Sequence, residues 1–359
     1  MEFAPTEPAL VEQLLSALQE APDTAARLVS HEIALSGGRA DAVVEATVGG
    51  ELVRLVIEAK RSAFPRDVRE ALWQLRNYLA HLPSWEGGQT LPMVIAESIS
   101  PGAKALLREE GVGYYDTGGS LYVPARRAYL FVDRPLPKRQ ARSLGAIFTG
   151  RRAQVLHAVW ASQGDWFGVH AIAERALVSP TTASETLVAL ERREWVVARG
   201  AGPTKERRLA DPRALLDSWT SHQLSARPPA WRHYYVPAAK PDDIIRRLDE
   251  ACDDHDAYAI TGLAAAQAYA PHLTSLTQLH CRIAAGAAET TLEALESRPV
   301  REGWNLGVIE SKSAGDFAFR ERLEPGWFAD PLQTYLDLLQ TGGRAREMAE
   351  HLRAERLQS

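Results

Sequence analysis

The residues of this sequence best suited to chemistry are two carboxylates within its first 60 positions. Asp41 lies early in one strand-like run and Glu58 near the end of the next, with Gly49-Gly50 as the tight turn between them. If the two runs pair as a hairpin, Asp41 falls opposite about residue 58. Two carboxylates at one point repel each other unless a divalent cation lies between them, and their oxygens suit Mg²⁺ or Mn²⁺. The spacing therefore predicts a metal site with Asp41 and Glu58 as ligands.

Lys60 adds a positive charge to the same place. Residues two apart on a strand point to the same side, so Lys60 and Glu58 share a face. The chain has 35 Arg and only 6 Lys, and arginine does not replace a compact, tunable ammonium. We expect Lys60 to hold a scissile phosphate and a polarised water. In the helix that follows, Gln74 and Tyr78 lie on one face at i, i+4.

The elements that must position these residues follow one another as α-β-β-β-α-β-α-β-β. Helices are predicted over residues 8–24, 65–81 and 101–110, and strands over 28–35, 40–48, 51–59, 91–96, 112–115 and 121–123. Together with Asp41, Glu58-Ala59-Lys60, Gln74 and Tyr78, this order resembles the PD-(D/E)XK nuclease superfamily, specifically its RecB-like and Mrr-like branches. The resemblance implies metal binding by Asp41 and Glu58 and a catalytic Lys60. It also implies that Gln74 and Tyr78 support the substrate or the metal.

The resemblance leaves two questions open. Many members also use an acid in the first helix, where Glu12 and Glu20 are both available. The fold is also often kept as a scaffold in proteins that no longer cut, and a solvated Glu–Lys pair at the end of a strand is common. A DNA-binding domain without cleavage is therefore the alternative to an active nuclease.

The middle of the chain is predicted to be a winged helix-turn-helix. Apolar residues follow helical spacing after Phe148, and a short helix covers residues 170–176. Ser179-Pro180 then opens a third helix, since serine caps helices and proline fits their first position. That helix turns Ala183, Leu187 and Leu190 inward. The strands at 195–199 and 205–209 form a hairpin, and helices followed by a basic hairpin are parts of a DNA reader.

Charge supports the same interpretation. Residues 138–213 carry 13 Lys and Arg against 7 Asp and Glu, a balance of +6, between flanking segments of −5 and −6. Such a basic segment is expected where DNA phosphates bind. The alternative is a three-helix core whose hairpin contacts another protein. The predicted DNA-binding residues are Ser179, Thr181, Thr182, Ser184, Arg192, Arg193, Lys205, Arg207 and Arg208.

The last third shows no catalytic set. Asp253-Asp254-His255-Asp256 reads as a solvated acidic turn, because consecutive side chains in a loop diverge. Two stretches, Tyr258 to Ala266 and Asp330 to Ala349, together with the winged helix, resemble the antitoxin of type IV toxin–antitoxin systems (AbiEi-like). The resemblance covers roughly residues 145–359. It implies a DNA-binding regulator that represses its own operon and offsets a nucleotidyltransferase-like toxin.

The whole chain of 359 residues is long enough for two or three domains. We predict an α/β multidomain protein: a PD-(D/E)XK nuclease-like domain at 1–137, a winged helix-turn-helix at 138–224 and an α/β antitoxin-like domain at 225–359. Only Cys252 and Cys281 occur, which argues against a disulfide framework. With no signal peptide or apolar run of about 20 residues, a cytoplasmic location is expected.

The function favoured at this point is a DNA-binding transcriptional regulator whose nuclease-like domain binds or senses DNA, single-stranded or damaged DNA included. The alternative is a Mg²⁺-dependent DNA endonuclease targeted by its winged helix, and a purely protein-binding antitoxin comes third. Double-stranded DNA is the expected partner of the winged helix. A nucleotidyltransferase-like toxin and a homodimer remain open, and Mg²⁺ or Mn²⁺ is needed only if the N-terminal site is active.

Overall fold

A computed structural model describes residues 5–358 except 36–37, 83–84, 86, 136, 139–143, 253–257 and 273–275. The predicted acidic turn at 253–256 lies outside the described residues. The chain divides into two compact units, which are described separately. Unit 1 contains residues 1–146 and 189–194, and unit 2 contains residues 147–188 and 195–359. The expected boundary near residue 137 lies close to this division, whereas the one between 224 and 225 falls inside unit 2.

Unit 1 is built on a seven-stranded sheet in sequence order, β1 to β7. The first three strands are antiparallel, β3, β4 and β5 run parallel, and the remaining pairs are antiparallel. The strands are β1 (Thr24–Leu35), β2 (Gly38–Val48), β3 (Glu51–Ala63), β4 (Gln89–Ile99), β5 (Gly113–Asp116), β6 (Leu121–Pro124) and β7 (Tyr129–Val132). The helices are α1 (Glu7–Glu20), α2 (Pro65–His81) and α3 (Pro101–Glu109).

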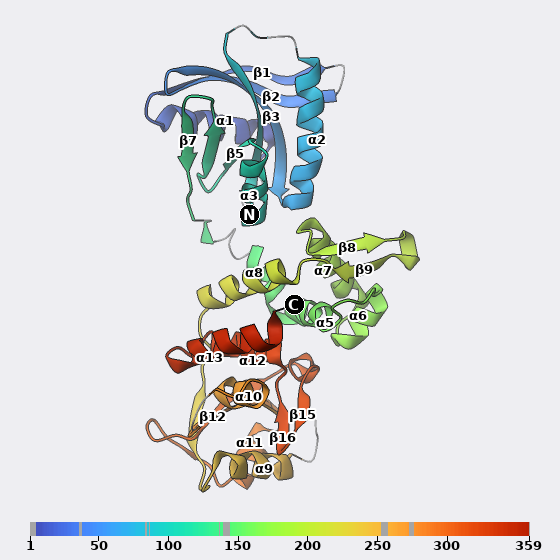
Figure 1. Cartoon of the computed structure of the whole chain (residues 1–359), viewed down its shortest axis with the longest axis vertical. Helices are drawn as coiled ribbons and strands as arrows, with labels where there is room; N and C mark the ends of the chain where they lie inside the picture. Colours follow the sequence, from blue (N-terminus) through green and yellow to red (C-terminus); the bar gives the residue numbers. More distant parts are fainter. Residues whose placement is uncertain are drawn as a thin grey trace. The chain divides into compact units, whose positions relative to one another are not determined.

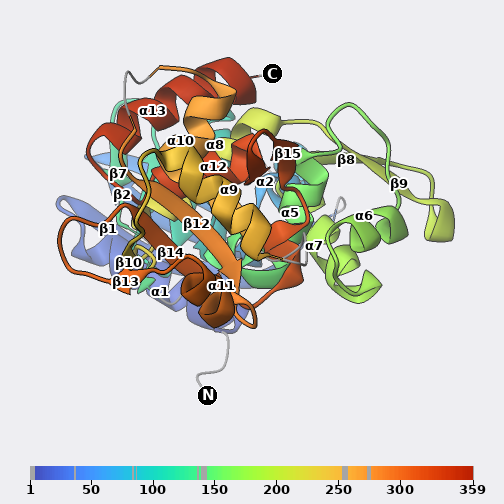
Figure 2. The same ribbon diagram turned by 90° about the horizontal axis from the view of Figure 1, so that it is seen from below.

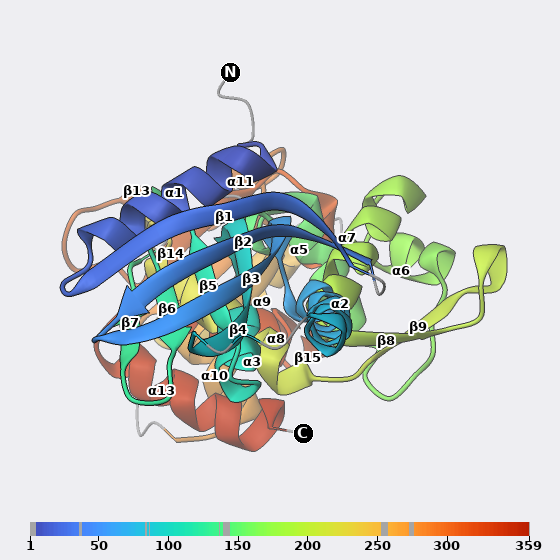
Figure 3. The ribbon, with the colours of Figure 1, turned by 90° about the horizontal axis from the view of Figure 1, so that it is seen from above.

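Helices cover both faces of this sheet (Figure 3). The leucines of α1 pack on the face formed by Leu55, Ile57 and their neighbours. The apolar sides of α2 and α3 pack on the opposite face, against residues such as Val56 and Val94. Because strand residues alternate between the two faces, Glu58 follows Val56 towards α2. The sequence pattern of β3 therefore decides which helix meets the candidate site.

Unit 2 begins with three helices, a hairpin and a fourth helix. These are α5 (Gly150–Trp160), α6 (Val169–Arg175), α7 (Pro180–Arg192, whose last turn groups with unit 1), β8 (Val196–Arg199), β9 (Glu206–Leu209) and α8 (Pro212–Ser225). Val155, Val159, Ala183, Leu187 and Leu190 are buried as their spacing predicts. The hairpin β8–β9 extends away from α5 and α6 (Figures 1 and 2). This element order is the one expected for a winged helix.

The rest of unit 2 is a mixed sheet in the order β13-β10-β14-β12-β11-β16-β15. Helices α10, α12 and α13 pack together, and α9 packs against α11 (Figure 1). The elements are β10 (Arg232–Tyr235), α9 (Pro241–Ala251), β11 (Tyr258–Thr261), α10 (Gly262–Tyr269), β12 (Leu279–Ala284), α11 (Ala288–Ala294), β13 (Arg298–Pro299), β14 (Leu306–Ser311), β15 (Glu321–Leu323), β16 (Gly326–Phe328), α12 (Pro331–Leu338) and α13 (Arg344–Leu352).

The predicted mixed α/β class is confirmed. The sequence did not predict β7, β10, β13, β15 or β16, each of which has four residues or fewer. The equally short β5, β6, β8 and β9 were predicted, so length alone does not explain the difference. Within the described ranges, no helix is both long and apolar enough to span a membrane.

Candidate functional site

The hairpin of β2 and β3 brings the two predicted metal ligands together. Its pairs run from Val48 with Glu51 to Ala42 with Ile57, so Asp41 comes next to Glu58 in the same register. The amide of Ala59 donates a hydrogen bond of 2.7 Å to Asp41 Oδ2. This bond fixes the Asp41 carboxylate against the end of β3.

Lys60, Gln74 and Tyr78 complete one connected cluster with Glu58. Lys60 Nζ lies 2.9 Å from Glu58 Oε1 and donates to Gln74 Oε1 at 3.2 Å. The Tyr78 hydroxyl donates to the other oxygen of Glu58, Oε2, at 3.3 Å. All five predicted side chains therefore lie at one end of β2 and β3, under one face of α2. Their catalytic roles remain predictions.

Gly38 makes room for Tyr78 at the start of β2. A Cβ atom on Gly38 would lie 2.8 Å from Tyr78 Cε1, which is closer than real Cβ contacts allow. Gly38 also has a φ of 138°, a backbone conformation that residues with a side chain rarely adopt. Glycine at this position lets the tyrosine ring reach Glu58.

The surroundings of Glu58 disfavour the ionised form of its carboxyl group. Burial, and then the nearby charge of Asp41, raise the pKa of Glu58, although hydrogen bonds from Lys60 and Tyr78 oppose the shift. Burial and the Glu58 charge raise the pKa of Tyr78 to about 12, so it remains a hydrogen-bond donor at neutral pH. A carboxylate that resists ionisation despite a neighbouring lysine gains from a further positive charge.

The donor set fits Mg²⁺ or Mn²⁺ with only two protein ligands. Among the described residues no group of three or more His, Cys, Asp or Glu side chains is placed to hold a metal ion. Mg²⁺ keeps several of its waters and often uses only one or two carboxylates. Glu12 and Glu20 do not supply a third, because both are exposed on α1, which covers the opposite face of the sheet.

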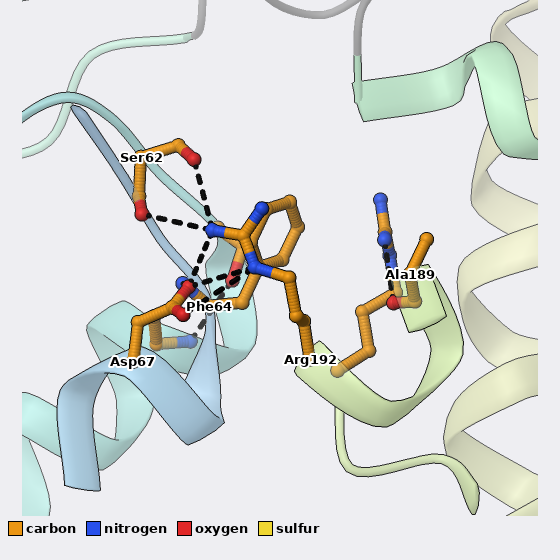
Figure 4. A network of polar contacts seen from close by, with 8 residues as sticks. Ser62, Phe64, Asp67, Ala189 and Arg192 are labelled. Atoms are coloured by element: carbon orange, nitrogen blue, oxygen red, sulfur yellow. Dashed lines mark hydrogen bonds and ion pairs between the residues drawn. The ribbon is translucent and has the colours of Figure 1, made fainter. Parts of the chain in front are cut away.

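Two predicted DNA-binding arginines are engaged elsewhere in unit 1, which corrects the expectation for them (Figure 4). Arg192 Nη2 lies 2.7 Å from Asp67 Oδ2 and 3.1 Å from Ser62 Oγ, with its guanidinium over Phe64. Arg193 donates to the carbonyls of Ala189 and Leu144 and also lies over Phe64. Burial, with the charge of Arg192, lowers the pKa of Arg193 to about 10. Their charge alone suggested phosphate contact, but their contacts are internal.

The first turns of α7 are placed as predicted. The amide of Thr182 donates to Ser179 Oγ at 3.2 Å, so Ser179 caps the helix and is occupied by that role. Thr181 is exposed, and Thr182 and Ser184 are half-buried, while Ala183 is buried. These side chains form the polar outer edge of the helix.

The hairpin residues divide between its two faces. Arg207 is 4% exposed and cannot reach a phosphate, which corrects that prediction. Arg208 is exposed and Lys205 is half-buried. Arg199 and Trp166, which were not among the predicted DNA-binding residues, lie beside Arg208. Strand alternation from buried Leu209 is the signal that would have placed Arg207 inside and Arg208 outside.

The described part of the last third contains a buried ion pair. Arg282 Nη2 lies 2.5 Å from Asp337 Oδ1, and Thr261 Oγ1 donates to Asp337 Oδ2 at 2.7 Å. Gln333 Nε2 donates to Asp337 Oδ1 at 2.9 Å. The carboxylate thus joins β11, β12 and α12, and the network is structural.

Comparison with known proteins adds little to this geometry. No protein-family model matches the chain, and no curated protein matches it. A repair endonuclease from Pyrococcus abyssi is 19% identical over 32% of this chain and 48% of its own, with a TM-score of 0.24. The EndoMS–dsDNA2 complex is 22% identical over 32% of this chain and 46% of its own, with a TM-score of 0.23.

The chain thus matches less than half the length of either solved structure. One is a repair endonuclease, and the other is a complex with double-stranded DNA. Likenesses this partial carry no argument about the fold or activity of this chain.

Proposed function

We propose that unit 1 is a divalent-cation-dependent nuclease acting on DNA, of the PD-(D/E)XK kind. The observation that supports this most is the convergence of Asp41, Glu58, Lys60, Gln74 and Tyr78 from three elements on one place. Hydrogen bonds join the last four side chains, and Asp41 accepts one from the amide of Ala59. Burial raises the pKa of the Glu58 carboxyl, and ionisable groups with shifted pKa values are common at functional sites. The sequence alone favours a regulator, and the geometry moves the balance towards the nuclease.

Each residue has a role in that proposal. Asp41 and Glu58 would hold Mg²⁺ or Mn²⁺, which supplies charge stabilisation at the phosphate and a water of lowered pKa. Lys60 places an ammonium beside the phosphate, where charge develops. Gln74 orients Lys60 through the 3.2 Å hydrogen bond, and Tyr78 orients Glu58 from the other side.

Incubation of the purified chain with single-stranded and double-stranded DNA and Mn²⁺ tests the proposal. We expect cleavage that disappears in Asp41→Ala and Lys60→Ala. Arg27→Ala is a matched control, since Arg27 is an exposed residue paired with Glu45 on β1 and β2. Absence of any product with either metal and either form of DNA would leave a binding domain.

DNA binding by the first part of unit 2 is the second candidate function, as part of a transcriptional regulator. The polar edge of α7 supports it, because Thr181 is exposed there and Thr182 and Ser184 are half-buried, and short polar side chains of this kind can contact base edges in a major groove. Thr181→Ala and Ser184→Ala should relax sequence preference, whereas Arg208→Ala should weaken binding to every sequence. Equal losses on all DNA for both kinds of variant would contradict this division of roles.

The AbiEi-like role rests on the sequence resemblance alone. It would make residues 225–359 the part that contacts a nucleotidyltransferase-like toxin, and a homodimer and a cytoplasmic location go with the same proposal. Co-purification of the tagged chain from its native host tests the partner. Recovery of a nucleotidyltransferase-like protein would favour the antitoxin, and recovery of DNA alone would favour the nuclease or the regulator.

A further inference from the structure

The outer face of the β8–β9 hairpin carries two arginines on one aromatic ring. The Arg199 guanidinium carbon lies 4.2 Å from the centre of a Trp166 ring, and that of Arg208 lies 5.0 Å from it. Arg199 comes from β8, Arg208 from β9, and Trp166 from the loop before α6. Three segments thus meet at one surface point of unit 2.

Backbone pairing explains why these side chains share a face. Phe167 and Arg207 exchange two backbone hydrogen bonds of 2.9 Å. This antiparallel bridge places the segment of Phe167 beside β9. The side chains of Phe167 and Arg207 point inward, at 5% and 4% exposure. Their neighbours Trp166 and Arg208 must then point outward.

Glu206 is the counter-charge on this surface. It pairs with Arg199 at 2.6 Å, and both side chains are about half exposed, at 40% and 54%. No ion pair of Arg208 is found among the described residues. The face therefore carries one guanidinium satisfied by a carboxylate and a second whose charge is not balanced by a direct partner.

A guanidinium stacked on an aromatic ring keeps its N–H groups available in its own plane. Stacking uses the flat face, while hydrogen bonds to phosphate are donated from the edge. Stacking also restricts the long arginine side chain before binding, so less conformational entropy is lost when the anion binds. Trp166 is thus suited to prepare both arginines for an anion.

We propose that Trp166, Arg199 and Arg208 form a clamp for a backbone phosphate of double-stranded DNA, in which Trp166 positions the two guanidiniums. The phosphate replaces Glu206 as the partner of Arg199. This inference rests on the proposed DNA binding of unit 2 and adds Trp166, Arg199 and Glu206 to the residues that determine it. Trp166 acts through the arginines and does not read bases.

Binding of the full chain to a duplex of random sequence, measured by fluorescence anisotropy between about 50 and 200 mM KCl, tests the clamp. Arg208→Ala should weaken binding and lower the salt slope by about one. Trp166→Ala should weaken binding roughly three- to tenfold, the range that ordering a long side chain costs. Trp166→Phe should restore most of the loss, and Glu206→Gln should tighten binding roughly twofold or more because it removes the competing carboxylate.

Coupling separates positioning from a merely structural role. In an Arg208→Ala background, Trp166→Ala should lose much of its effect, whereas damage to the hairpin would weaken binding as much as before. Trp166→Ala and Glu206→Gln binding like the wild type would overturn the clamp and leave DNA binding by unit 2 intact. No binding by the wild type at any salt concentration would overturn both.

Discussion

Glu58 is the residue whose ionisation most directly reports on the site. Burial and the charge of Asp41 raise its pKa in the folded protein. The contribution of Glu58 to stability is therefore fully present below its ordinary pKa of 4.5 and is lost as the pH rises through the raised value. Glu58→Gln cannot titrate, so its melting temperature relative to the wild type should rise as the pH is raised above the ordinary pKa of 4.5.

Glu45 supplies a control of opposite sign on the neighbouring part of the hairpin. Although burial acts to raise it, hydrogen bonds and charge from Arg27 and Arg54 hold the pKa of Glu45 below its ordinary value. Its contribution is present at neutral pH and is lost as the pH falls, so Glu45→Gln should lose stability relative to the wild type as the pH rises. The same pH dependence for both variants would contradict the assigned environments.

Alanine substitutions at Gly38 and Gly50 separate the effect of a steric clash with a neighbouring side chain from the effect of a positive φ alone. Gly38→Ala should cost about 1–3 kcal/mol of unfolding free energy, since the new Cβ meets Tyr78 in a strained conformation. Gly50 also has a positive φ, of 81°, but nothing lies within 4 Å of its added Cβ. Urea unfolding of Gly50→Ala should show the smaller loss, and Gly38→Ala alone should also disturb Mn²⁺ binding. A tighter or unchanged site in Gly38→Ala would contradict the role given to Tyr78.

The residues of the candidate site could be predicted because a local turn sets their register. Gly49-Gly50 fixes the pairing of β2 with β3, and two residues equidistant from that turn must meet. No such local turn predicts whether the side chains of Arg192 and Arg193 face DNA. Their partners, Asp67, Ser62 and the carbonyl of Leu144, are distant in sequence, and only the tertiary structure brings them together.

Among the elements of unit 2, the buried pair of Arg282 and Asp337 should have a large effect on stability. Asp337→Ala would leave a buried guanidinium without its carboxylate, at a cost of about 3–5 kcal/mol. Glu310→Ala is the control, because its partner Arg232 is 63% exposed and the loss should stay within about 1 kcal/mol. Equal losses in urea unfolding would mean that Asp337 does not hold β11, β12 and α12 together.

Helices, long strands and the short β8–β9 hairpin were predictable, whereas β7, β10, β13, β15 and β16 were not. The helix predicted at 65–81 is found with the same ends, since Pro65 starts it and Asp67 accepts a hydrogen bond from the Phe64 amide. Strands β15 and β16 have three residues each and depend on pairing with each other and with β11. Such strands exist through their neighbours rather than through their own sequence pattern.

Within unit 2, the predicted division between residues 224 and 225 meets continuous packing. His157 Nε2 on α5 lies 2.8 Å from Asp330 Oδ2 at the start of α12. Thr220 Oγ1 on α8 lies 2.9 Å from the Tyr335 hydroxyl. The sequence does not predict these contacts, because the two residues of each pair lie far apart in the chain and neither belongs to a recognisable local motif. The predicted domains at 138–224 and 225–359 are therefore best tested together in the full chain.

At the scale of the whole molecule, the central question is whether the N-terminal cluster cuts DNA, and the behaviour of Lys60→Ala with Mn²⁺ tests this most directly. Lys60 partly neutralises Glu58, so its removal should leave Mn²⁺ binding at least as tight as in the wild type. Cleavage at saturating Mn²⁺ should nevertheless fall about 100-fold or more, because the ammonium that stabilises the phosphate is lost. Cleavage by Lys60→Ala at the wild-type rate, or a wild type that binds Mn²⁺ and leaves DNA intact, would contradict the account.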